Sequence, residues 1–200
     1  MIYKFSIVTY LNPVLAKKVR KLQKNLFKVT DSEAAIKLWK PHFTIGSGVK
    51  VSEKELKALY MDIKATLSYF KPFKVNINNC GSMDDWTGGD LPGHTPYVIY
   101  LRVILNKKLS RLARIIKEKV TDKRKIWYGQ PWPFKPHVAL ANKDLSKKGF
   151  IKGKEISKHE KFSGKDIIDH LSLAIEDKNG KWIEYKKYKF IKKYLNRILN

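Results

Sequence analysis

The sequence predicts a single domain of mixed α and β structure, made of two similar halves. Two observations predict it. In each half, a segment with the alternation of a strand is followed by one with the apolar spacing of an amphipathic helix. A short motif around Lys-Pro-His also occurs once in each half. The 200 residues suffice for one large domain or one domain of two similar lobes.

The first half is expected to contain three strands and two helices. Residues 3–10 alternate as a strand, and residues 12–26 begin with Asn-Pro, a pair typical of an N-cap and a first helical residue. A short strand follows at 42–46. Residues 52–70 open with Ser and Glu three positions apart, which predicts a capping box and a helix. Residues 73–77 alternate again as a strand.

The second half is expected to repeat the order of strand and helix. Glycines and prolines in residues 81–96 predict a long loop between the halves. The apolar run 97–104 is typical of a buried central strand, and an Asn at 106 predicts the cap of a helix reaching 120. A basic and aromatic loop, 121–136, then leads into a strand at 137–141.

The C-terminal region is expected to form a hairpin and a helix. Two strand-like segments, 167–175 and 181–190, flank the sequence Asp-Lys-Asn-Gly at 177–180. Because Asn-Gly is a strong signal for a type I′ turn, these segments predict a β-hairpin. A final basic helix is expected at 191–199.

Charge and cysteine content restrict the class of protein. There are 42 lysines and arginines against 18 acidic residues, a formal net charge of +24, and such a field attracts polyanions such as RNA or DNA. A lysine-rich solvated surface is the alternative. Cys80 is the only cysteine, which excludes an intramolecular disulfide and metal sites built on paired cysteines. With no secretory signal and no apolar run near the roughly 20 residues of a bilayer span, we expect a cytoplasmic protein without membrane contact.

The repeated motif supplies the candidate catalytic residues. Residues 39–46 read WKPHFTIG and residues 134–141 read FKPHVALA, so each copy has an aromatic, Lys, Pro and His before an apolar strand. Each proline favours an extended residue before it, and a strand repeats every two residues. We therefore expect His42 and His137 to face each other across one groove, where a neutral and a protonated imidazole can share acid–base chemistry at neutral pH.

These motifs resemble those of the two-histidine (2H) phosphoesterase superfamily, which includes the RNA 2′,3′-cyclic phosphodiesterases also named 2′-5′ RNA ligases. The resemblance rests on PHFTIG, on PHVALA, on the strand and helix before each, and on the closing hairpin with DKNGKW at its turn. It implies an α+β fold with two pseudo-symmetric lobes, each an antiparallel sheet flanked by helices, and a central basic groove. The lobes would be interleaved in one domain, residues 1–200.

The resemblance also implies the reaction and its residues. His137 would act as base on a water while His42 protonates the departing ribose oxygen, which opens a 2′,3′-cyclic phosphate to a 2′-phosphate; the roles swap in the ligation direction. Thr44 would hold a phosphate oxygen. Ala139 stands where the second hydroxyl is expected, and losing one such donor costs roughly 2.7–4 kcal/mol of transition-state stabilisation in comparable sites.

Several groups are candidates to replace the missing hydroxyl at Ala139. They are backbone N–H groups, Asn142, Lys143 and a base from the run 123–125. For stacking on substrate bases the candidates are Tyr128, Trp132 and Phe134, with Trp86 a lesser one. The alternative for these aromatics is that they fasten their loop to the core.

Other histidines and other functions have to be weighed. His170-Leu171-Ser172 also fits the pattern of the second motif, but no Lys-Pro precedes it, so His137 is preferred; His94 and His159 are expected to be surface residues. With two imidazoles and no converging carboxylates or cysteines, no metal and no cofactor are expected. The expected partners are RNA ends or small cyclic nucleotides. The alternatives are a non-catalytic RNA-binding protein with a degenerate site and a phosphodiesterase for cyclic oligonucleotide signals.

Overall fold

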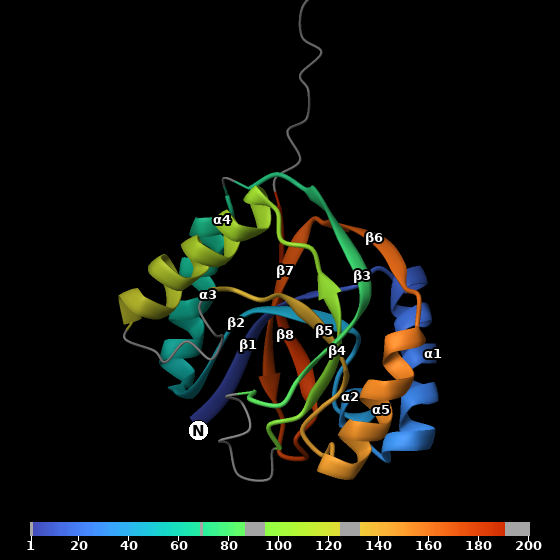
Figure 1. Cartoon of the computed structure of the whole chain (residues 1–200). Helices are drawn as coiled ribbons and strands as arrows, with labels where there is room; N and C mark the ends of the chain where they lie inside the picture. Colours follow the sequence, from blue (N-terminus) through green and yellow to red (C-terminus); the bar gives the residue numbers. More distant parts are fainter. Residues whose placement is uncertain (1, 69, 87–94, 125–132, 191–200) are drawn as a thin grey trace, which may run out of the picture.

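The computed structural model describes residues 2–68, 70–86, 95–124 and 133–190, and they form two antiparallel sheets with helices outside them (Figure 1). This confirms the predicted α+β class with two antiparallel sheets. Each sheet has four strands. In spatial order, the first sheet consists of β2 (His42–Ser52), β1 (Ile2–Tyr10), β7 (His170–Glu176) and β8 (Trp182–Lys189), and the second of β5 (His137–Ala141), β4 (Val98–Val103), β3 (Phe73–Met83) and β6 (Ser163–Ile168).

The helices cover the outer faces of the sheets. Helix α3 packs on β1, β2 and β8 of the first sheet, and α4 lies beside it, while α1 and α5 pack on strands of the second sheet. Figure 1 shows these two pairs on opposite sides of the molecule. The helices are α1 (Pro13–Thr30), α2 (Ala34–Lys37), α3 (Glu53–Leu67), α4 (Lys107–Ile116), which continues into a π turn (Lys117–Thr121), and α5 (Lys147–His159).

Side-chain caps begin the helices where the sequence predicts. The Asn12 side chain accepts a hydrogen bond from the backbone of Leu15, and Asn106 does the same at the start of α4. Ser52 and Glu55 form both bonds of a capping box at α3. Each cap satisfies N–H groups that the first turn leaves without helical partners. The starts of these three helices are therefore confirmed.

The core is continuous between the sheets and their helices. Burial alternates at the start of β3, while the inner strands β1 and β7 of the first sheet are buried over five successive residues. The helices add apolar residues at the spacing of one helical face, such as Leu15, Val19 and Leu26 of α1. Glycines bring α5 close to α1, because a Cβ on Gly149 would lie 2.6 Å from the backbone oxygen of Thr30. This packing holds the second sheet at a fixed distance from α1.

Two segments differ from the sequence-based expectation. The expected strand 167–175 is two strands, β6 and β7, which belong to different sheets, so only β7 pairs with β8 in the closing hairpin. The expected loop 81–96 begins later, since β3 continues to Met83. Gly81 lies within this strand because the Tyr100 ring lies over it, where a Cβ would be 2.7 Å from Tyr100 Cζ. Helix α5 and strand β6 were not expected from the sequence.

The closing hairpin is confirmed, but its turn is not type I′. A type I′ turn needs positive φ at two successive residues, whereas only Gly180 has it here, with φ of 73°. The Asp177 carboxylate accepts hydrogen bonds from the backbone of Asn179 and Lys181, each 2.9 Å long, and so stabilises a longer turn that ends in a left-handed glycine. The helix expected at 191–199 lies outside the described residues.

No helix within the described ranges is long and apolar enough to cross a bilayer.

Candidate active site

The two Lys-Pro-His motifs lie on edge strands that contact each other. Strand β2 is the edge of the first sheet and β5 the edge of the second, and residues of the two strands are neighbours in space. His42 is the first residue of β2 and His137 the first of β5. The positive charge of His137 acts on the pKa of His42, which requires the two rings to be close. The structure thus brings the predicted histidine pair together.

The strand pairing repeats the same geometry in both sheets. In the first sheet, Tyr10 pairs with His42 and Val8 pairs with Thr44, so all four side chains share one face. The register shifts between Ile7 and Val8, because β2 has one extra residue, Ile45, at this point. This face of β1 and β2 is the one that carries the first motif.

The second sheet has a matching arrangement around its motif. Arg102 pairs with His137 and Tyr100 pairs with Ala139, again beside a register shift that comes just before Tyr100. Arg102 is exposed and occupies the position that Tyr10 has in the first sheet. The sequence analysis missed this arginine, because only the register of β4 against β5 places it next to the histidine.

Both histidines are oriented by the same backbone contact. His42 Nδ1 lies 2.8 Å from the carbonyl oxygen of Lys40, and His137 Nδ1 lies 3.0 Å from that of Lys135. A carbonyl oxygen only accepts hydrogen bonds, so Nδ1 must carry the proton in both rings. The Nε2 atom of each neutral ring is therefore the one that can accept a proton, and Nε2 of each protonated ring can donate one.

Burial lowers the pKa of both imidazoles below the ordinary value. For His42 burial lowers the pKa to about 4; the hydrogen bond to the Lys40 carbonyl opposes this shift, while the charges of His137 and Lys143 add to it. The pKa of His137 is lowered mainly by burial as well, again against its backbone bond. Because the charge of His137 adds to the lowering for His42, protonation of one ring disfavours protonation of the other.

Aromatic rings enclose the two imidazoles. Trp39 stacks on His42 with ring centroids 4.1 Å apart, and Trp182 stacks on the other side of Trp39 at 4.2 Å. On the second sheet, Trp86 meets His137 edge-on at 5.0 Å. These rings account for the burial that lowers the pKa values. Trp39 occupies the aromatic position of the repeated motif, which is the only sequence signal for its place in the site.

Comparison with known proteins agrees with this arrangement. A model of the 2'-5' RNA ligase superfamily matches residues 33–180, which include both motifs. The chain belongs to the 2'-5' RNA ligase superfamily. A search of the curated proteins finds no match.

Solved structures of this superfamily's fold resemble the chain over nearly its whole length. Escherichia coli LigT complexed with 3'-AMP superposes with a TM-score of 0.64 at 14% identity and covers 96% of this chain and 100% of LigT. The protein TT0787 of Thermus thermophilus gives a TM-score of 0.63 at 16% identity, covering 94% and 97% of the two chains. A structure described only as a phosphoesterase gives 0.64 at 14% identity, covering 96% and 100%. Identities this low show the shared fold, and membership of the 2'-5' RNA ligase superfamily supports phosphodiester chemistry.

In this superfamily member, α1 links the two motifs through a buried polar contact. Arg20 donates to the carbonyl oxygen of Trp39 at 2.7 Å, to two carbonyls of α2 and to the Gln23 side chain. Gln23 in turn donates to the carbonyl oxygen of Ala139 at 2.9 Å. Asp144, just after β5, accepts from backbone N–H groups at the start of α2. These contacts fix the spacing of the motifs, and the sequence analysis found none of them.

The candidate phosphate-binding residues, Thr44 of the first motif and the possible substitutes Asn142 and Lys143, take different positions. The Thr44 side chain has no hydrogen bond to any described residue and shares a face with His42. Lys143 has a φ of 63°, a left-handed conformation, and its ammonium lies 5.8 Å from the Trp182 ring centroid and acts on the pKa of His42. Burial lowers the pKa of Lys143. Asn142 is half-buried in the same segment, and the structure gives its side chain no contact that assigns it a role.

The other candidates are placed less favourably. Phe134 is only 5% exposed and belongs to the core, so its face is not open to a base and its expected stacking role is corrected to a packing role. Tyr128 and Trp132 lie outside the described residues. Lys123 of the basic run pairs with Asp62 at 3.3 Å. Among the described residues, Trp86, the lesser candidate, is the one of these aromatics that lies against His137.

The remaining histidines do not join the pair. His170 lies on β7 of the first sheet, the same sheet as His42, and its Nδ1 lies 2.6 Å from the Asp169 carboxylate. It therefore does not take the place of His137 on the second sheet. The side chain of His159 is 82% exposed, as expected for a surface residue, and His94 lies outside the described residues. Among residues 2–68, 70–86, 95–124 and 133–190, no three side chains of His, Cys, Asp or Glu gather as metal ligands.

Proposed function

We propose that this chain opens 2′,3′-cyclic phosphates at RNA ends to 2′-phosphates, with reverse 2′-5′ ligation as the same chemistry run backwards. The observation that carries the proposal is the matched pair of imidazoles, both held through Nδ1 on edge strands that contact each other. Two such rings suit a displacement in which one oxygen loses a proton while another gains one. Thr44 and Lys143 beside His42 supply a hydroxyl and a cation for the phosphate oxygens.

The pKa of His42, lowered by burial to about 4, keeps this ring neutral near neutral pH and supports a definite division of roles. Neutral His42 accepts a proton through Nε2 from a water, whose oxygen attacks the cyclic phosphorus. The bond from phosphorus to the ribose 3′-oxygen breaks, and Nε2 of protonated His137 gives that oxygen its proton. The product carries a 2′-phosphate and a 3′-hydroxyl. This assignment is the reverse of the one expected from the sequence, which made His137 the base.

The half of the site on β5 has to hold a phosphate oxygen without a hydroxyl at position 139. Arg102 pairs with His137, is exposed, and makes no ion pair or hydrogen bond with any described residue. Its guanidinium offers two parallel donors to an anionic oxygen. In the proposed reaction Arg102 and Lys143 supply the positive charge that offsets the loss of the second hydroxyl.

The reaction can be tested directly on a cyclic mononucleotide. The purified protein should convert adenosine 2′,3′-cyclic phosphate into the 2′-phosphate, identified by chromatography against both isomers. Since the proposal routes no step through a metal, the rate should be the same after dialysis against EDTA. Loss of hydrolysis on chelation with recovery on adding zinc or magnesium would contradict the mechanism. No turnover of any cyclic phosphate would contradict the proposed function.

The pH profile should reflect the lowered pKa values of the pair. Catalysis needs one protonated and one neutral ring, so kcat/KM should be highest between the two pKa values of the free protein. Both pKa values lie below the ordinary value of 6.5, and that of His42 is about 4, so both rings are neutral above pH 6.5. We expect kcat/KM to be highest on the acid side of pH 6.5. On the alkaline side of that maximum it should fall by about tenfold per pH unit. A maximum at pH 7.5 or higher would contradict this interpretation.

Ala139 favours a second candidate, a non-catalytic RNA-binding protein with the same groove. In that case binding of a short single-stranded RNA should weaken steeply with salt, because the charge of +24 dominates it, and no cyclic phosphate should be hydrolysed. Including cyclic dinucleotides in the substrate panel separates RNA-end opening from cleavage of cyclic oligonucleotide signals.

A further inference from the structure

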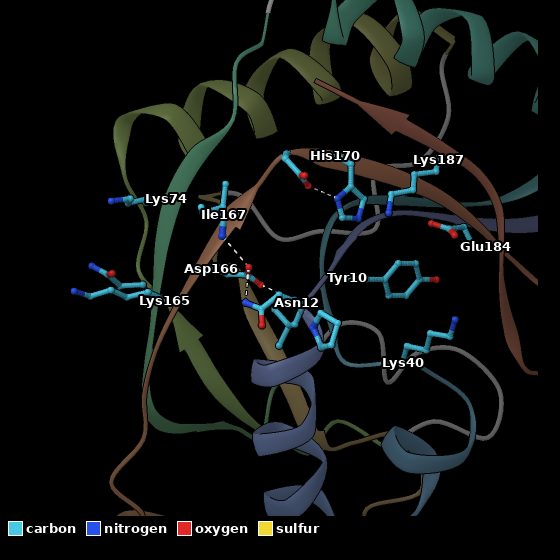
Figure 2. Close-up of a pocket in the computed structure, with 14 residues that line it drawn as sticks. Tyr10, Asn12, Lys40, Lys74, Lys165, Asp166, Ile167, His170, Glu184 and Lys187 are labelled. Carbon is cyan, nitrogen blue, oxygen red and sulfur yellow. Dashed lines mark hydrogen bonds and ion pairs between the residues drawn. The ribbon is translucent and has the colours of Figure 1, made fainter. Parts of the chain in front are cut away.

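A cleft next to the histidine pair is lined by residues of both sheets. Its volume is about 950 Å³, and Tyr10, Lys40, His170, Lys187, Lys165 and Asp166 are among the residues that line it. Figure 2 shows the side chains of His170, Lys187 and Glu184 close to the Tyr10 ring, with Lys40 on the other side of that ring. The proposed reaction uses none of these side chains.

The acidic residues of the cleft already have partners. Asp166 accepts hydrogen bonds from the backbone and side chain of Asn12 at 3.0 and 2.9 Å. The Asp169 carboxylate bonds to Nδ1 of His170 at 2.6 Å, and Glu184 accepts a short hydrogen bond from the hydroxyl of Ser172. These bonds hold the negative charges at the walls of the cleft.

The lysines of the cleft, unlike its acidic residues, have no side-chain partners among the described residues. Within the described part of the chain, the ammonium groups of Lys40, Lys74, Lys165 and Lys187 make no ion pair and no hydrogen bond. His170 is mostly buried, with a side chain 13% exposed, and its Nδ1 lies 2.6 Å from the Asp169 carboxylate, so the ring is held at the wall of the cleft. The cleft therefore offers several unpaired donors, while its carboxylates are engaged, which is the composition of an anion site.

Tyr10 and Lys40, which line the cleft, are the neighbours of His42. Tyr10 is the strand neighbour of His42, and its ring lies 6.1 Å from the His42 ring, edge-on. Lys40 lies two residues before His42, and its carbonyl orients that ring. Tyr10 is thus a shared wall, with the reacting phosphate on one side and the cleft on the other.

We propose that this cleft binds the backbone phosphate of the nucleotide adjoining the reacting one, so that the preferred substrate is the end of an RNA strand and not a free cyclic nucleotide. This inference rests on the proposed function and names its substrate class. Lys187 contacts the phosphate, and Tyr10 separates it from the reacting group. A cyclic mononucleotide, which has no second phosphate, leaves the cleft empty.

The test compares two substrates in two variants of equal charge. The substrates are adenosine 2′,3′-cyclic phosphate and a trinucleotide that ends in the same group. Lys187→Ala should lower kcat/KM for the trinucleotide by about tenfold, the effect of one charge-assisted phosphate contact, and change the mononucleotide by less than about twofold. The control is Lys152→Ala on the exposed face of α5, which removes the same charge outside the cleft and should leave both substrates unchanged.

The result that would overturn the inference is an equal loss on both substrates, or no loss on either, in Lys187→Ala. Binding measurements distinguish failure of this inference from failure of the proposed function. If neither substrate is turned over, Kd values for the trinucleotide and the mononucleotide still show whether Lys187→Ala weakens only the longer ligand. Selective weakening supports the cleft as a phosphate site, and equal Kd values in wild type and variant reject it.

Discussion

Replacing His42 by alanine should lower kcat for adenosine 2′,3′-cyclic phosphate by about 10²–10⁴-fold, the usual contribution of a positioned acid or base. The reason is specific to this ring: its Nδ1 is committed to the Lys40 carbonyl, and its low pKa leaves Nε2 free to accept the proton of the attacking water. Single-turnover rates with excess enzyme measure the chemical step directly. Circular dichroism of the same sample checks that the fold persists.

The matched control for this prediction is His159→Ala. That side chain is 82% exposed at the end of α5, so its loss should leave the rate essentially unchanged. The roles within the pair are separated by a substrate whose 3′-oxygen is replaced by sulfur, a leaving group that needs no proton. On it, His137→Ala should recover most of its lost rate, while His42→Ala should not. Recovery in His42→Ala alone would reverse the assignment of acid and base.

Restoring a hydroxyl by Ala139→Thr should raise kcat by about 10²–10³-fold, the size of effect seen for one preorganised donor to a developing charge. Ala139 shares a face with His137 and is half-buried, so a threonine hydroxyl there would point toward the same groove. Its carbonyl stays bonded to Gln23, which keeps the strand in place. The measurement is kcat at saturating cyclic mononucleotide, with KM determined in parallel.

Ala139→Val is the control for this gain, because valine has the shape of threonine without the hydroxyl. It should leave kcat at or below the wild-type value. A gain in both variants would mean that side-chain volume, and not the hydroxyl, limits the reaction. No gain in Ala139→Thr would indicate that Arg102 or Lys143 already provides the stabilisation, and Arg102→Ala in the threonine background then tests which of them does.

Much of the fold could be predicted because its signals are local. Asn12, Ser52 and Asn106 each cap the helix that follows, and a cap acts over three residues. The His42 and His137 strands were found because the Lys-Pro-His repeat is a short contiguous pattern in each copy. The prediction of one strand at 167–175 was wrong because the signal is not local. The alternation of these residues gives no sign that Asp169 divides them between two sheets.

The site was predicted only in part because most of its walls come from distant segments. Trp182 stacks on Trp39 although most of the chain separates them in sequence, and Arg102 reaches His137 only through strand register. Phe134 has the same place in its motif as Trp39, yet one ring is in the core and the other covers a histidine. Pairings of this kind depend on the packing of the two sheets, which a local pattern does not encode.

The stack of Trp182, Trp39 and His42 also makes intrinsic tryptophan fluorescence a probe of the site. Trp39 lies between a second indole and an imidazole at 4.2 and 4.1 Å, distances at which excited-state indole is sensitive to the charge of a neighbouring ring. Protonation of His42, or an anion placed against it, should therefore alter the tryptophan emission. The ionisation of His42 could then be followed in real time, without an added label, through the wavelength and intensity of the tryptophan emission.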